Sequence, residues 1–357
     1  MVFALFGVPS PLTYWMLAAL RTMADVCYSR HHYVESPVLT GFRESLERDD
    51  DIPTVFFCDC PEAELVDAVL NCDAAVLVCL EAPPEVLGYC LKERAMKPID
   101  ALRFTVQCFS TLYDLAVDPR TKVIRRRSDL LTSDSIIEIC AAFHMTFDPT
   151  LAAEGVRRLT GGAELSDALA EDVIQKMYPN AKPVGEYTRL LPEMGVDAWV
   201  VETADCFAPL LKGKAVKEVY WPRQAFLDPF STGQVVALTQ SLTGPSRHLI
   251  YGPMLHLPRG EWRACIDIQL ADAGVNAMLA DVAIQGNPIW KGRFELPEFG
   301  RFEFAFEFAI TEPRHFTEIR FVLLHGAIEG AFSFGGVQLT RIDAATSEER
   351  IGQEEGL

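Results

Sequence analysis

The sequence has no apolar run that reaches the roughly 18 residues of a membrane-spanning helix. Positive charge is also scarce, because 32 lysines and arginines stand against 50 aspartates and glutamates, for a formal net charge of −18. Nucleic acids and anionic membranes are bound through cationic patches, so this balance argues against both. We therefore expect no nucleic-acid partner and no membrane insertion. A neutral partner such as a sugar, or a basic protein, suits the charge better.

Features of secretion and of metal binding are missing as well. No basic residue precedes the first apolar run and no small-residue cleavage site follows it, so we expect the N-terminus to belong to the fold. Most of the ten cysteines lie in apolar segments, which suits free thiols in a reducing cytoplasm. Cys58 and Cys60 are too closely spaced for a zinc motif and lack a second pair. We expect a soluble, cytoplasmic protein without a metal.

The first part of the chain alternates apolar strands with amphipathic helices, which predicts an α/β domain over residues 1–160 with a parallel, helix-covered sheet. A polar loop after the first helix holds His31, His32 and the mostly acidic run from Glu47 to Asp51. The expected strands are 2–6, 54–57, 74–80 and 122–124, and the expected helices are 12–26, 62–70, 83–94, 98–117 and one from Ser133 or Asp134 to 145.

The second part changes character. A helical and irregular connector is expected over residues 161–219, and alternating runs separated by turns then predict an antiparallel β-sandwich over 220–342. In one run, four phenylalanines from Phe302 to Phe308 alternate with Glu303, Ala305 and Glu307, as in a strand with one packed face. Residues 343–357 are expected to form an acidic tail. The runs are 262–270, 278–284, 292–296, 301–308, 318–324 and 335–342.

The first fifteen residues carry the main functional signal. A short strand, a Gly/Pro turn and a helix direct free backbone N–H groups toward an anion in many α/β proteins. Here, however, the turn from Gly7 to Thr13 contains no lysine, and Pro11 removes one backbone donor. The same segment is also compatible with a proline-capped helix start that binds no ligand.

With these elements in order, residues 1–150 resemble the sulfotransferase branch of the P-loop fold. The donor loop of that family runs Pro-Lys/Arg-Ser-Gly-Thr-Thr-Trp, and Pro9, Thr13 and Trp15 match it. Its second motif, Arg-x-Pro with a serine six residues later, aligns with Pro83, but Glu81 replaces the arginine and Tyr89 the serine. A carboxylate where a phosphate docks is repulsive. The resemblance therefore implies a sulfotransferase-like domain with degenerate donor motifs.

The second domain resembles a jelly-roll module of bacterial proteins of polysaccharide assembly. The similar segments include Tyr251-Gly252-Pro253, the run from Leu257 to Trp262, and the run from Gly326 to Gly330. This resemblance covers about residues 220–342 and implies a carbohydrate-binding-like sandwich.

Candidate site residues follow from these two resemblances, each beside a structural alternative. A working sulfotransferase needs a base that reaches an acceptor hydroxyl. However, paired histidines are also typical of exposed loops, and single acidic residues are also typical of turns. Sugar binding needs an exposed aromatic ring flanked by planar polar groups, although such a tryptophan can equally be packed. The candidate bases are His31, His32 and Asp59; the candidate donor contacts are Pro9, Ser10, Thr13 and Tyr14; and the candidate sugar contacts are Trp290, Tyr251, His256 and Arg293.

Two further features have alternatives of the same kind. The basic run Arg125-Arg126-Arg127 suits either a phosphate or sulfated chain, or a solvated strand end paired with carboxylates. Trp262 is expected in the core of the sandwich.

The sequence leaves open whether the protein is an enzyme. Our leading hypothesis is a glycan-recognition or scaffold protein in bacterial surface-polysaccharide synthesis, without a cofactor and with other synthesis proteins as further partners. The alternative is an active sulfotransferase that transfers sulfate from 3′-phosphoadenosine 5′-phosphosulfate to a carbohydrate.

Overall fold

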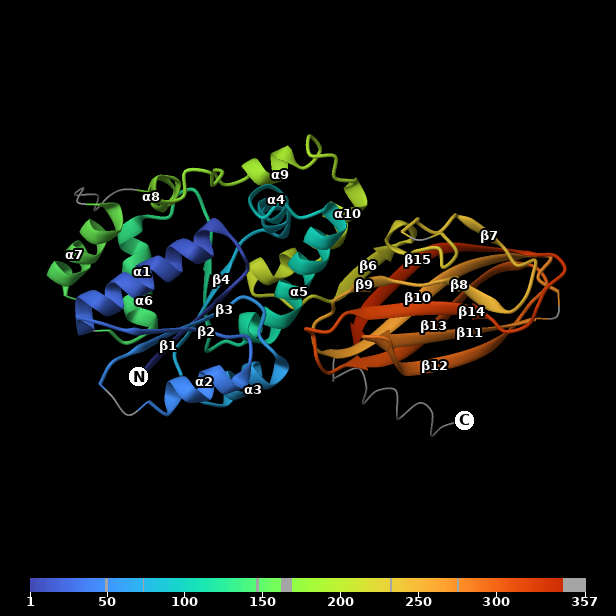
Figure 1. Ribbon diagram of the computed structural model, residues 1–357, viewed down its shortest axis with the longest axis horizontal. Coiled ribbons are helices and arrows are strands. Elements are labelled where there is room, and N and C mark those ends of the chain that lie inside the picture. Colours follow the sequence, from blue (N-terminus) through green and yellow to red (C-terminus); the bar gives the residue numbers. More distant parts are fainter. Residues whose placement is uncertain are drawn as a thin grey trace. The chain divides into compact units, whose positions relative to one another are not determined.

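The computed structural model describes residues 1–48, 51–72, 74–145, 148–161, 169–231, 233–274 and 276–342. It divides the chain into one unit from Met1 to Ala215 and a second that begins at Val216 (Figure 1). Part of the expected acidic run, Asp49 and Asp50, and the expected acidic tail 343–357 lie outside the described residues.

Within its described part, the first unit contains a five-stranded parallel sheet in the order β2-β3-β1-β4-β5. The sequence predicted this α/β class, and the structure confirms it. Side chains are buried along the central strands because helices cover both faces of the sheet. The strands are β1 (Val2–Gly7), β2 (His32–Glu35), β3 (Thr54–Cys58), β4 (Val76–Leu80) and β5 (Lys122–Arg125).

Alternate residues of β1 belong to opposite faces of the sheet. Phe3 and Leu5 join a core that includes Trp15, and Ala4 and Phe6 are buried on the other face. Helix α1 packs beside α6, α7 and α8, whereas α5 packs with α3, α4 and α10. The helices are α1 (Pro11–Tyr28), α2 (Leu39–Leu46), α3 (Ala63–Asn71), α4 (Pro83–Glu93), α5 (Pro98–Val117), α6 (Thr132–Ala142), α7 (Pro149–Thr160), α8 (Ala170–Met177), α9 (Glu186–Leu190) and α10 (Ala198–Asp205).

The expected polar loop after α1 is wrong in part, because β2 and α2 form there. The described residues between Gly161 and Ala215 belong to the first unit. They form α8, α9, α10 and a 3₁₀ helix at Ala208–Lys212, and α10 packs on α4 and α5. None of the described helices is long and apolar enough to span a membrane.

The second unit is an antiparallel β-sandwich with the two-sheet architecture expected of a jelly roll. One sheet has the order β13-β10-β15-β6 with β7 on β15, and the other has the order β12-β11-β14-β8 with β9 on β14. Trp262 is fully buried, as expected, and its indole Nε1 donates to the Pro258 carbonyl at 2.9 Å. The strands are β6 (Glu218–Pro222), β7 (Thr239–Ser241), β8 (Arg247–Ile250), β9 (Pro253–Leu255), β10 (Gly260–Ala271), β11 (Asn276–Ile284), β12 (Asn287–Leu296), β13 (Gly300–Ile310), β14 (Thr317–Leu323) and β15 (Ala331–Ile342).

Candidate functional site

The first unit has a topological switch point between its adjacent strands β1 and β4. The chain leaves β1 toward β2 at one end of the strand order, and leaves β4 toward β5 at the other end. Ligands of open parallel sheets bind at the carboxyl ends of the strands at such a point. Ser10, Glu81 and Arg126 follow β1, β4 and β5, respectively, at this edge.

The loop after β1 is closed by its own hydroxyl groups. The Ser10 side chain caps α1 by accepting from the Thr13 backbone N–H at 3.3 Å, and it donates to Thr13 Oγ1 at 3.2 Å. The Thr13 hydroxyl in turn donates to the Val8 carbonyl at 2.6 Å. A Cβ atom on Gly7 would lie 2.7 Å from Thr13 Oγ1, so only glycine fits beneath this turn. Pro9, Ser10 and Thr13 are all buried.

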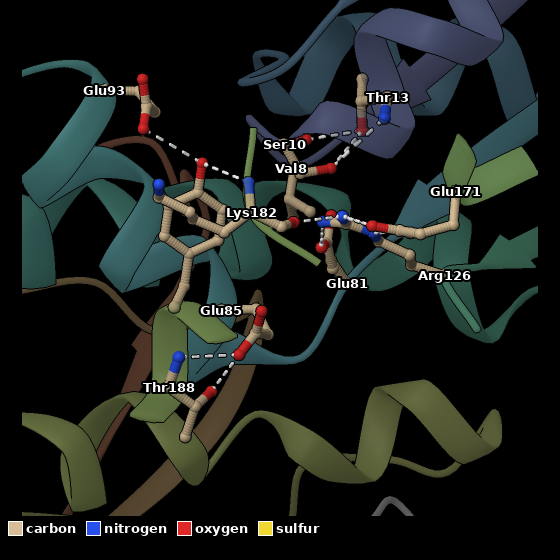
Figure 2. Close-up of polar contacts among 11 residues, drawn as sticks. Val8, Ser10, Thr13, Glu81, Glu85, Glu93, Arg126, Glu171, Lys182 and Thr188 are labelled. Carbon is tan, nitrogen blue, oxygen red and sulfur yellow. Dashed lines mark hydrogen bonds and ion pairs between the residues drawn. The ribbon is translucent and has the colours of Figure 1, made fainter. Parts of the chain in front are cut away.

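The Arg126 guanidinium group lies against Glu81, the residue that follows β4 (Figure 2). Its Nη1 donates to Glu81, its Nε and Nη2 donate to Glu171 of α8 at 3.1 and 2.7 Å, and Nη2 also donates to the Lys182 carbonyl at 2.6 Å. Only 2% of the Arg126 side chain and 4% of the Glu81 side chain are exposed. The sequence-based expectation of a solvated arginine is therefore wrong for Arg126, whereas its pairing with carboxylates is confirmed.

The electrostatics of this cluster are set by burial and by pairing. Burial raises the pKa of Glu81, and the Arg126 charge opposes that shift. Burial also disfavours the charged form of Arg126, but the Glu81 and Glu171 carboxylates outweigh it and raise the Arg126 pKa. The guanidinium thus stays charged, and that charge is balanced by the protein's own acids.

A further carboxylate lies at the start of α4. Glu85 belongs to the first turn of this helix, is buried, and accepts from the Thr188 backbone N–H at 2.8 Å (Figure 2). A helix N-terminus attracts negative charge, and here the chain itself supplies it. An anionic ligand at this edge would therefore meet two acidic side chains, Glu81 and Glu85.

The structure brings two of the predicted site residues, Tyr14 and Asp59, close to one arginine. Arg94 Nη2 donates to the Tyr14 hydroxyl and lies 4.0 Å from Asp59 Oδ2. Burial raises the pKa of Tyr14, against the opposing charge of Arg94. Tyr14 is thus a neutral phenol held at the start of α1.

The two candidate histidines lie at the opposite edge of the sheet. His32 begins β2 and is in register with Thr54, the first residue of β3. The carboxyl end of β2 is Glu35, three residues further on and about 10 Å away at the usual strand rise, and β3 ends one residue later. His31 is engaged there, since Nδ1 lies 2.7 Å from Asp25 Oδ1 and Nε2 accepts from Arg21 Nε at 3.2 Å. The structure does not bring His31 and His32 together with Asp59 or Ser10.

The four candidate sugar contacts of the second unit are also dispersed. Trp290 stacks on Phe306, with ring centroids 3.9 Å apart and planes 11° apart, whereas Arg293 is on the opposite, exposed face of β12. Tyr251 is partly buried and pairs through its backbone with Leu227. His256 is buried, with Nδ1 3.1 Å from the Pro313 carbonyl.

Sequence reasoning missed the partnership of Arg126 with Glu171, which no local pattern reveals, because 45 residues separate the two. The replacement of arginine by Glu81 in the motif resembling the sulfotransferases was the available signal. It indicated that a cation elsewhere in the fold had to balance a buried acid.

No family model matches the sequence, and no curated protein is significantly similar to it. Among solved structures, the chain is similar to the CBM36-1 domain of a multidomain xylanase from the hindgut metagenome of Trinervitermes trinervoides, with 11% identity and a TM-score of 0.27 over 36% of this chain and all of that one. A xylan-binding module, CBM15, matches with 9% identity and a TM-score of 0.27 over 35% of this chain and 97% of that one. TmCBM61 in complex with β-1,4-galactotriose matches with 11% identity and a TM-score of 0.24 over 35% of this chain and 88% of that one.

Proposed function

We propose that the protein recognises carbohydrate and does not transfer sulfate. The observation that carries this proposal is the internal neutralisation of Arg126 by Glu81 and Glu171. A sulfate or phosphate group at the switch point would have to displace one of these acids. Breaking a buried ion pair leaves an uncompensated charge, which is strongly unfavourable.

The loop after β1 supports the same conclusion. A donor loop needs N–H groups and hydroxyls that are free for the ligand, together with a cation. Here the hydroxyls of Ser10 and Thr13 bond within the turn. No transfer step is therefore assigned to the first unit.

Recognition is assigned to the second unit, on the outer face of the sheet β12-β11-β14. Asp281 is buried there and accepts from Arg320 Nε at 2.6 Å and Nη2 at 3.0 Å. Arg293 is exposed on the neighbouring strand β12, where its Nη2 donates to Glu295 Oε1 at 3.0 Å. Planar groups held by cross-strand and same-strand pairs suit the hydroxyl groups of a glycan. From the sequence resemblance, we propose that this recognition serves bacterial surface-polysaccharide synthesis, together with other proteins of that process.

A nucleotide titration tests the first half of the proposal. Isothermal titration of the full chain with 3′-phosphoadenosine 5′-phosphate should give no heat at millimolar ligand. Micromolar binding that Thr13→Ala abolishes would instead contradict this proposal and favour the active sulfotransferase.

A glycan array tests the second half. The full chain should retain at least one glycan, and Arg293→Ala should lose it. Arg301→Ala is the matched control, because Arg301 is an exposed strand arginine paired with an acid, Asp267, on the other sheet. Retention by neither the wild type nor the control, or equal retention by all three proteins, would contradict recognition at this face.

A further inference from the structure

A pocket of about 350 Å³ opens beside the switch point of the first unit. Its wall is formed by the start of α1, the end of α4 and the segment after α8. The side chains that matter chemically are Tyr14, Tyr89, Tyr178, Glu93 and Asn180. This size falls in the range of small-molecule sites, and the position is one where open parallel sheets bind ligands.

The charge of the pocket disfavours an anionic ligand. Among the described residues that line it, Glu93 is the charged one, and there is no lysine or arginine. Arg94 is nearby, but it is engaged with the Tyr14 hydroxyl and with Asp59. A nucleotide phosphate would therefore face the Glu93 carboxylate, while the Arg94 cation beside the pocket is already shared with the Tyr14 hydroxyl and Asp59.

The polar groups of the wall are held in place before any ligand arrives. The Tyr187 hydroxyl donates to Glu93 Oε1 at 3.3 Å and accepts from the Lys182 backbone N–H at 3.3 Å (Figure 2). The Tyr89 ring is 6.3 Å from the Tyr14 ring and 5.9 Å from the Tyr187 ring, centroid to centroid. Because Tyr14 accepts from Arg94 and its pKa is raised by burial, its own proton remains a hydrogen-bond donor.

We propose that this pocket binds one uncharged sugar ring. It would be a carbohydrate site of the first unit, in addition to the site proposed on the sandwich. The apolar face of the ring packs on tyrosine, while its hydroxyls bond to the Glu93 carboxylate, the Asn180 amide and the tyrosine hydroxyls. The choice of a carbohydrate as ligand rests on the proposed function. The pocket itself is independent of the site proposed on the outer face of β12. An ammonium ligand would use the Glu93 carboxylate and the tyrosine rings but not the Asn180 amide or the tyrosine hydroxyls, whereas a sugar ring uses all of these groups.

The test is calorimetric titration of the full chain with methyl glycosides of glucose, galactose, mannose and N-acetylglucosamine. At least one should bind, and Asn180→Ala should weaken that binding by about fivefold, as expected for one lost hydrogen bond. Tyr89→Ala should weaken it more, through the lost ring face. Asn180 is exposed, so its variant is expected to fold even if Tyr89→Ala, which loses the packing on Tyr187, does not.

Tyr220→Ala is the matched control, since Tyr220 is a 45% exposed tyrosine of the second unit. The proposal is overturned if no glycoside binds, if Asn180→Ala binds as tightly as the wild type, or if choline binds more tightly than every glycoside. An array signal lost in Arg293→Ala, with no glycoside binding, would leave the proposed function standing and remove this pocket. Glycoside binding that depends on Asn180, with an empty array, would leave this pocket standing and remove the site on the outer face of β12.

Discussion

Arg126 lies 45 residues from each of its two carboxylate partners, Glu81 before it and Glu171 after it. Its neighbours in sequence behave differently, because Arg125 is exposed and Arg127 forms a solvent-exposed pair with Asp129 at 3.3 Å. Three consecutive arginines thus have different environments. The difference arises because the middle side chain points into the unit at the end of β5, where two acids already lie.

Replacing Arg126 should be strongly destabilising. Arg126→Gln leaves Glu81 and Glu171 buried without their cation, and we expect a loss of about 3–5 kcal/mol in the free energy of unfolding. Urea denaturation followed by circular dichroism measures it. Arg127→Gln, which breaks a solvent-exposed pair, should cost less than about 1 kcal/mol. The triple variant Glu81→Gln, Arg126→Gln, Glu171→Gln should recover part of the loss, and equal losses in the single and triple variants would contradict an ionic cause.

Trp290 is the residue for which packing and sugar binding make different predictions. One face of its indole stacks on Phe306, and a Cβ atom on Gly292 would lie only 2.4 Å from Trp290 Cη2. Trp290→Ala should therefore lower the free energy of unfolding of the sandwich by about 2–4 kcal/mol. This loss is somewhat smaller than that for truncating a fully buried tryptophan, because Trp290 is only partly buried. Thermal unfolding should accompany any glycan assay of this variant. Lost glycan binding at an unchanged melting temperature would make Trp290 a contact instead.

Among the helices and strands, the sequence predicted the long elements with strong periodicity, but it did not predict the short strands at the edges of the sheets. All six expected strands of the sandwich form, with ends within a few residues, and α5 spans 98–117 as predicted. The strand β2 was missed because His32 and Glu35 give a half-exposed edge pattern that resembles a loop. The strands β6 to β9 are only three to five residues long, so they carry little alternation to detect.

The N-terminus of α1 offers a test at this scale. The Ser10 cap satisfies one of the unpaired N–H groups of the helix, so Ser10→Ala should destabilise the first unit by about 1 kcal/mol. Ser10→Gly should cost only a few tenths of a kcal/mol at a capping position. Chemical denaturation of both variants gives the comparison. If Ser10 were instead a ligand contact, both variants would keep wild-type stability.

At the scale of the whole molecule, the order and direction of the strands determine which candidate residues lie at the same edge of the parallel sheet, and the sequence alone does not show this. The strand-loop-helix at the start of the chain predicted a site at the carboxyl end of the first strand, and Ser10 and Thr13 do lie there. The distance of His31 and His32 from that edge could not be predicted, because β2, the strand that begins at His32, was not recognised. The pocket was equally hidden, since Tyr14, Tyr89 and Asn180 come from three distant segments.

The division into two units makes a prediction about unfolding. Each unit has its own buried core, with Trp15 in the first and Trp262 in the second, so each should unfold cooperatively by itself. Scanning calorimetry should then resolve two transitions. Arg126→Gln should lower the melting temperature of one, and Trp262→Phe, which loses the indole bond to Pro258 and leaves a small cavity, should lower that of the other. A single transition that both substitutions shift would show that the two cores unfold as one, and the sugar sites of the two units would then have to be tested as a coupled pair.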